Sequence, residues 1–265
     1  MNPSTCEISD RDWEMIQKVL PNEIYKGHGS LGGRPHADLR RTFCGILHFV
    51  RSGCQWDLVP KCYGARSTLE KYFAKWAHFG SFDQLMTESL ELYDRVIGIK
   101  WKFQPIDGSI KRAPGCSAGA GENPTDRARP GVKHMILTDQ KGILLAATII
   151  QANETDMKNL ETTLQEIRIK RPDPRKVEQH ILVDKGFDSD ENREISESWG
   201  YHHHIREKGE GWARLKTFTP KRWVVERTHS WLNQFRGIYT RRVHNPDFYQ
   251  AMLLLACSCV ILSKL

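Results

Sequence analysis

The chain has 265 residues, 39% of them hydrophobic and 27% charged, which suits a folded protein and excludes a disordered tail. Its formal net charge of +7 favours polyanionic partners, although many basic proteins bind no nucleic acid. Seven scattered cysteines without a CxxC pair support neither a zinc ribbon nor a disulfide framework, so we expect a reducing cytoplasm. The longest apolar run, residues 251–262, is shorter than the roughly 20 residues of a membrane span, so no membrane association is expected.

The first hundred residues predict helices and no strands. Apolar residues recur at helical spacing over residues 10–20, 38–51, 67–79 and 82–97. The third of these helices turns aromatic residues inward and leaves Arg66, Lys71 and Lys75 outside. This pattern favours a small helix-turn-helix-like DNA-binding domain over residues 1–98. The alternative is a plain helical bundle whose lysines are merely solvated.

Beyond residue 100 the pattern changes to strands alternating with helices. Strands are predicted at 101–106, 132–137, 143–150, 180–183 and 201–205. Helices are predicted at 154–168, 189–199, 222–235 and 246–263. We therefore expect an α/β domain with a mixed sheet over residues 99–265.

Two aspartates stand at the predicted ends of strands. Asp107 and Asp184 each have a glycine close behind, Gly108 and Gly186, which can turn the backbone away and expose the carboxylate. Ligand sites in open α/β sheets gather at such strand ends. A third acid, Glu226, lies in the helix that is expected from residue 222. A single aspartate at a strand end is more often a turn or a helix cap, so the prediction depends on the combination.

Three carboxylates suit divalent-metal chemistry on phosphodiesters. Mg²⁺ and Mn²⁺ prefer oxygen ligands. Two such ions about 4 Å apart can clamp the attacking and leaving oxygens of an in-line displacement. We therefore expect Asp107, Asp184 and Glu226 to be both the metal ligands and the catalytic residues.

The helix that contains Glu226 has one polar and one apolar face. The polar face is formed by Thr219, Arg222, Glu226 and Asn233, and the apolar face by Val224, Thr228, Trp231 and Phe235. An arginine four residues before a glutamate is the less favourable order for a helix pair, so stability gives little reason for it. An acid flanked by Arg222 and Arg227 instead fits a site for metal ions and phosphate.

Several short motifs occur together in a specific order. They are Asp107-Gly108-Ser109, Asn123-Pro124-Thr125-Asp126-Arg127, Ala152-Asn153-Glu154-Thr155-Asp156, Val183-Asp184-Lys185-Gly186-Phe187-Asp188-Ser189, and Arg222-Trp223-Val224-Val225-Glu226-Arg227-Thr228. In these motifs, and in Gly45-Ile46-Leu47 and Arg51-Ser52-Gly53-Cys54-Gln55-Trp56, the chain resembles DDE-type bacterial insertion-sequence transposases of the IS-four/IS-five group. Thr219 and Asn233 depart from the group's Tyr-x2-Arg-x3-Glu-x6-Lys signature, and Phe187 stands where tyrosine is usual.

The resemblance implies a ribonuclease-H-like catalytic domain with two Mg²⁺ or Mn²⁺ ions. It implies cleavage at the terminal inverted repeats of the element and strand transfer into target DNA. A homo-oligomer assembled on DNA and a bacterial, nucleoid-associated location are expected. Arg222, Arg227 and Lys185 are predicted to hold phosphates.

Other candidate features have weaker patterns. Arg127, Arg129 and Lys133 are predicted to follow a DNA backbone near Asp107, and the alternative is a solvated loop. The residues 115–121 are Gly-rich, but no Gly-Lys-Ser/Thr follows, so no nucleotide cofactor is expected. Residues 202–204 are three histidines, but neighbours on a strand point to opposite faces, so a metal site there is not favoured.

Two rival functions stay open. A host ribonuclease-H-like nuclease or resolvase would cut without strand transfer, and inverted repeats flanking the coding sequence would favour the transposase. An inactive transposase-derived DNA-binding protein would keep only the helical domain's function. The intact set of Asp107, Asp184 and Glu226 argues against such a relic.

Overall fold

The N-terminal part of the molecule is helical, as predicted. The computed structural model describes residues 7–21, 37–204 and 223–265. Its first helices are α1 (Asp10–Val19), α2 (Leu39–Ser52), α3 (Arg66–His78) and α4 (Ser81–Val96), with the short 3-10 turns η2 (Trp56–Leu58) and η3 (Lys61–Tyr63) between α2 and α3. Ser9 and Asp38 cap α1 and α2 by accepting from backbone N–H groups of the first turn. No helix among the described residues is long and apolar enough to cross a membrane.

A mixed β-sheet forms the second part of the molecule. Its strands are β1 (Phe103–Arg112), β2 (Gly121–Glu122), β3 (Pro130–Thr138), β4 (Leu144–Gln151), β5 (His180–Leu182) and β6 (His202–His204). The order is β2-β3-β1-β5-β6, and β4 also pairs with β3. β3 is antiparallel to β1 and to β4, whereas β5 is parallel to β1 and to β6. This antiparallel half joined to a parallel half is the ribonuclease-H-like arrangement, so the predicted fold class is confirmed.

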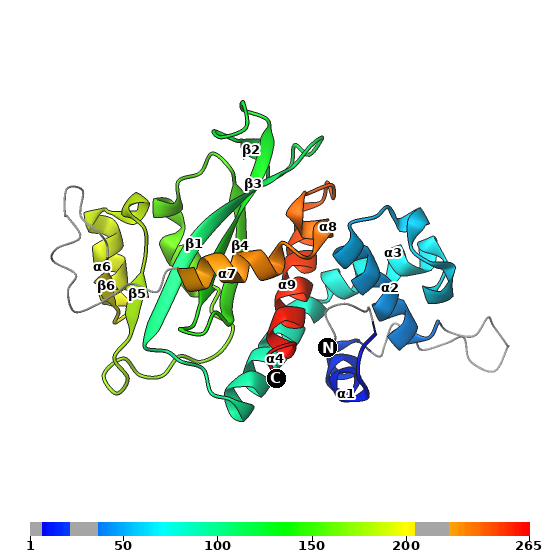
Figure 1. Cartoon of the computed structure of the whole chain (residues 1–265), viewed down its shortest axis with the longest axis horizontal. Coiled ribbons are helices and arrows are strands. Elements are labelled where there is room, and N and C mark those ends of the chain that lie inside the picture. Colours follow the sequence, from blue (N-terminus) through cyan, green and yellow to red (C-terminus); the bar gives the residue numbers. More distant parts are fainter. Residues whose placement is uncertain (1–6, 22–36, 205–222) are drawn as a thin grey trace.

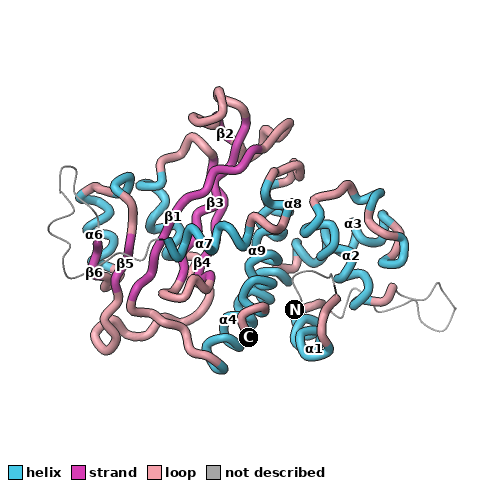
Figure 2. The backbone as a smooth tube through the Cα atoms, in the orientation of Figure 1, coloured by secondary structure: helices cyan, strands magenta, loops and turns pink. Residues whose placement is uncertain are grey.

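The remaining elements are mainly helices placed around this sheet. They are η4 (Asp156–Asn159), α5 (Leu160–Gln165), η5 (Lys185–Phe187), α6 (Asp190–Ser198), α7 (Trp223–Leu232), α8 (Arg236–Tyr239) and α9 (Pro246–Leu262). Figure 1 shows α7 crossing β1 and β4, with α6 at the β6 edge of the sheet. Figure 2 shows the strands and the helices α1, α2 and α3 at opposite ends of the molecule, with α4 and α9 between them.

The central helix α9 joins the two ends of the molecule. All residues from Ala251 to Leu262 are buried, which confirms the prediction of a buried C-terminal helix. α9 packs along α4 and also contacts α2, α3, α7, α8 and β4. One hydrophobic core therefore continues across residue 98. The division into domains at that residue stays a prediction.

The bounds of several predicted elements differ from the structure, most clearly at β1 and at the helix expected over 154–168. β1 does not end at Ile106 but continues to Arg112, because it pairs with β3 as far as Gly131. The helix expected over 154–168 is the short turn η4 followed by α5. Its start is lost because the Glu154 carbonyl accepts from Lys133 Nζ at 2.8 Å instead of from a helical N–H. The strand predicted over 201–205 is β6 (His202–His204), and Ile205 lies outside the described residues.

Candidate active site

Asp107 lies in β1, and Asp184 lies two residues beyond the end of β5, the parallel neighbour of β1. The ladder between β1 and β5 ends at the pair Pro105 and Leu182, and Asp107 and Asp184 each follow two residues later. The register therefore places Asp107 of β1 beside the point where β5 ends and the chain continues to Asp184.

Asp107 is not at the end of its own strand, which corrects the sequence-based expectation. It lies within β1, opposite Ile136 of β3. Gly108 accordingly does not turn the chain away from the sheet. A Cβ at this position would lie 2.8 Å from Lys133 Cδ and 2.9 Å from Met135 Sδ, so the glycine permits close packing across the strands.

Asp184 is positioned by the short turn that follows it. Its carbonyl accepts from Phe187 N at 2.9 Å, and the Phe187 ring is fully buried. The Phe187 carbonyl in turn accepts from Asn192 Nδ2 of α6 at 3.0 Å. These contacts anchor the backbone while the Asp184 residue itself stays exposed.

Glu226 lies on the solvent-exposed face of α7, near its N-terminal end. One turn further on, His229 is buried against β1, and its Nε2 lies 3.3 Å from the Asp107 carbonyl oxygen and 4.0 Å from the Asp107 carboxylate. Residues three apart on a helix are neighbours. His229 therefore fixes the turn of α7 next to Glu226 against the strand that contains Asp107.

The turn between β3 and β4 holds the other side of α7. Thr228 Oγ1 donates to the Gly142 carbonyl at 2.8 Å, and Arg227 Nη2 donates to the Lys141 carbonyl at 2.6 Å. Gly142 has a φ of +87°, and a Cβ there would lie 2.8 Å from Thr228 Oγ1. Only a glycine allows this approach without strain.

A second polar contact ties α7 to β1 further along the strand. Lys111 is 5% exposed, and its Nζ donates to Asn233 Oδ1 at 2.6 Å and to Ser109 Oγ at 2.9 Å. Burial lowers the pKa of Lys111 to about 8. Asp107, Ser109 and Lys111 alternate along β1, so they share the face that α7 covers.

The described residues fit a divalent cation by their chemistry. All three predicted ligands are carboxylates, and the Asp107 side chain is 25% exposed while Asp184 and Glu226 are exposed. Hard cations prefer such oxygen ligands. Within the described residues, however, no three His, Cys, Asp or Glu side chains lie close enough together to hold a metal ion.

The structure gives some predicted phosphate ligands another role. Lys133 is not in a loop: it lies in β3, is buried, and pairs with Asp156 and the Glu154 carbonyl. Its register opposite Ile110 places it on the sheet face away from α7. The Arg227 guanidinium lies between the rings of Trp223 and Trp231, at 4.8 and 4.7 Å from their centroids.

The other predicted DNA-binding residues lie apart from the carboxylates or outside the described part. Arg127 and Arg129 are exposed in the turn before β3. On α3, Arg66 pairs with Asp57 and Glu70, Lys71 is exposed and Lys75 is half-buried. Arg222, Thr219 and the Lys185 side chain lie outside the described residues.

The sequence analysis missed His229 and Lys111. His229 directly follows the Glu226 motif at helical spacing, but it was expected on neither face of the helix. Lys111 lies four residues after Asp107, so a longer β1 would have placed both residues on one face. Trp231 was expected on the buried face of α7 but is only half-buried. The Arg227 guanidinium and the Lys264 ammonium both lie over its ring.

The mixed sheet, with helices packed around it, defines a ribonuclease-H-like fold. Residues 102–262 match the family model described as "Transposase DDE domain", and residues 8–86 match "Putative transposase of IS4/5 family". The chain belongs to the DDE transposase family, and its function is DNA transposition. The resemblance identified from the sequence motifs is thereby confirmed.

A relative that is similar in sequence agrees with this assignment. The chain is 38% identical over 148 residues to the "Putative transposase for insertion sequence element IS402" of Burkholderia cepacia, covering 53% of this chain and 67% of that protein. Solved structures with a similar trace include a piggyBac transposase synaptic complex with hairpin DNA (13% identity, 99% of this chain, 75% of that chain, TM-score 0.44). The catalytic domain of Mos1 mariner transposase is another such structure, with 11% sequence identity and a TM-score of 0.29. The match covers 68% of this chain and 93% of that chain.

Proposed function

We propose that this chain cleaves phosphodiester bonds at the ends of its own DNA element and joins the freed 3′-hydroxyl to target DNA. Asp107, Asp184 and Glu226 would hold two divalent cations, Mg²⁺ or Mn²⁺. The observation that supports this is the position of Asp107 in β1 beside the end of β5, which Asp184 follows by two residues, together with the packing of the Glu226 helix on Asp107 through His229. DNA is the partner, and an assembly of several copies would bring two element ends together.

The chain's own residues supply the geometry of the reaction. When bound, the cations would lower the pKa of the attacking water or 3′-hydroxyl and stabilise the leaving oxygen. Asp107, held in β1, and Asp184, which follows β5, would bind the cations from the side of the sheet. Glu226 would close the other side from α7, which His229 and Thr228 fasten to the sheet.

The test is a nicking and strand-transfer assay with purified protein on supercoiled DNA containing the repeats that flank the gene. Mg²⁺, Mn²⁺ and EDTA are compared for the wild type and for Glu226→Gln. We expect metal-dependent cutting and joined products from the wild type, and a loss of at least about 10²-fold in the variant, because a metal ligand is lost.

Glu91→Gln is the matched control, since Glu91 is an exposed glutamate in α4. It should cut like the wild type. Cut but unjoined products would favour the host nuclease instead. DNA binding without cutting in either metal would exclude an active enzyme and favour the inactive DNA-binding relic.

A further inference from the structure

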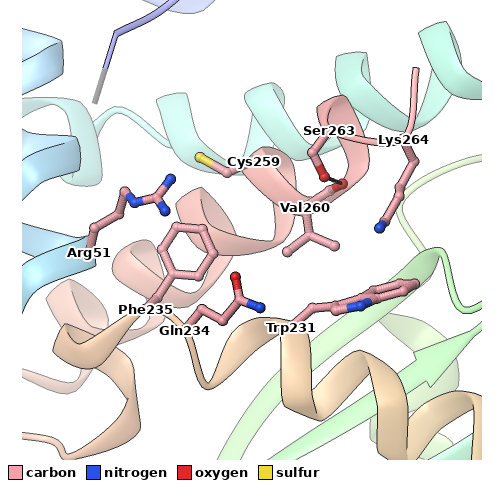
Figure 3. A pocket seen from close by; sticks show the side chains of 8 residues that line it. All are labelled: Arg51, Trp231, Gln234, Phe235, Cys259, Val260, Ser263 and Lys264. Atoms are coloured by element: carbon pink, nitrogen blue, oxygen red, sulfur yellow. Dashed lines mark hydrogen bonds between the residues drawn. The ribbon is translucent and has the colours of Figure 1, made fainter. Parts of the chain in front are cut away.

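A pocket at the junction of α2, α7 and α9 has two cations and no acid in its lining (Figure 3). Arg51, from the last turn of α2, lies at one end, and Lys264, just after α9, lies at the other. Among the described residues neither of them forms an ion pair. Two cations without a counter-ion in one pocket favour an anionic ligand.

Aromatic rings hold both cations in place. The Lys264 ammonium lies 3.8 Å from the Trp231 ring centroid, and the Arg51 guanidinium lies 5.4 Å from that of Phe235. Such stacking orders a long side chain while leaving its charge available to a further ligand. The Gln234 side chain lies between the two rings in Figure 3 and adds an amide donor.

The pocket and Glu226 share one helix, because Trp231 of α7 lines the pocket. The accessible residues of α7 and the turn after it form one face: Trp223, Glu226, Arg227, Ser230, Trp231 and Gln234. Five residues separate Glu226 from Trp231, a rise of about 7.5 Å along a helix. Phosphates of one DNA strand recur about every 3.4 Å along the duplex axis, so this rise corresponds to roughly two base pairs.

We propose that this Arg51–Lys264 pocket binds the phosphodiester backbone of the DNA a few nucleotides from the reacting bond. The inference depends on the proposed function for the identity of the ligand. Because Arg51 belongs to α2 and Trp231 to α7, one stretch of DNA backbone would contact both the helical part and the helix that contains Glu226. The pocket would thus couple DNA binding by the N-terminal helices to placement of the strand at the carboxylates.

The experiment measures the affinity of the full chain for a short duplex at several salt concentrations. Arg51→Gln and Lys264→Gln should each reduce the slope of log K against log salt by about one, and the double variant by about two. Arg51→Lys and Lys264→Arg keep the charge and should keep the slope. Thermal melting of every variant establishes that it is folded.

Arg175→Gln is the matched control, since it removes one exposed arginine that is paired with Asp173 and should leave the slope nearly unchanged. A double variant with the wild-type slope, or an equal loss in Arg175→Gln, would overturn the proposal. The nicking assay on the same proteins separates the two ideas. Wild-type cutting with no slope change in the double variant refutes only the pocket, whereas a slope change without any wild-type cutting refutes only the proposed function.

Discussion

The side chain of His229 lies at the centre of the candidate site. Burial, with a smaller contribution from the nearby Lys111 ammonium, lowers its pKa to about 4. The imidazole is therefore neutral at pH 7, and its Nε2–H can donate to the Asp107 carbonyl. A neutral ring positions the strand without neutralising the Asp107 carboxylate, whose charge would stay available to cations.

The depressed pKa of His229 makes stability depend on pH. The folded-state value of about 4 lies below the ordinary value of 6.5, so as the pH falls the unfolded chain takes up a proton first. The contribution of His229 is fully present above pH 6.5 and is lost as the pH falls toward 4. Between pH 6.5 and 5 the free energy of unfolding should decrease by about 2 kcal/mol from this residue alone.

Urea unfolding at pH 7, 6 and 5 measures this decrease, and His229→Gln should show a shallower one. His134 is also fully buried with a lowered pKa, so it should account for a remaining decrease in the variant. Equal pH dependence in the wild type and His229→Gln would show that the ring is protonated as readily in the folded protein as in the unfolded chain.

At the scale of elements, the junction of β1 and α7 determines where Glu226 lies relative to Asp107. Two polar contacts span it: His229 with the Asp107 carbonyl, and Lys111 with Asn233. The Lys111 contact has an energetic cost, because burial disfavours its ammonium form. Because the Lys111 contact costs free energy, its role is more easily explained by the positioning of α7 on β1 than by stabilisation of the fold.

Lys111→Met tests this interpretation. Because methionine is similarly long but uncharged, we expect little loss of melting temperature or even a gain. Cutting, however, should slow by on the order of 10- to 100-fold, since a small displacement of α7 moves Glu226. Lys102→Met removes an exposed lysine just before β1 and should change neither quantity. If Lys111→Met instead melted early and cut normally, Lys111 would be a purely structural residue.

The elements also show what the sequence could and could not predict. Helices such as α2 and α3 were predicted well because their apolar stripes are set by local spacing. The length of β1 was not predicted, because residues 107–112 form a strand only through pairing with β3, whose partner residues lie about 19 to 29 positions away in sequence. The same pairing hid the fact that Asp107 and Lys111 share a face. Burial of Lys133 was also unpredictable, since Asp156, its partner, lies in a separate element.

At the scale of the whole molecule, the alternation of strands and helices was sufficient to predict the α/β class, whereas the role of the three carboxylates stays a prediction. The sequence did not predict how the N-terminal helices join the sheet. That connection depends on α9, whose residues are apolar on all sides and so do not indicate which neighbour each side contacts. In the structure α9 packs on α4 and also contacts β4 and α7.

This shared packing predicts that the protein unfolds as one unit rather than as two domains divided near residue 98. Leu90 of α4 is fully buried, so Leu90→Ala should reduce the free energy of unfolding by about 2–5 kcal/mol. Far-UV circular dichroism and tryptophan fluorescence should report one coincident urea transition in both proteins, shifted as a whole in the variant. Glu91→Gln, at the exposed neighbouring position, should leave the transition in place. Two separate transitions, with only the earlier one moved by Leu90→Ala, would instead mean that the helices before residue 98 fold independently of the sheet, and that α9 merely docks against them.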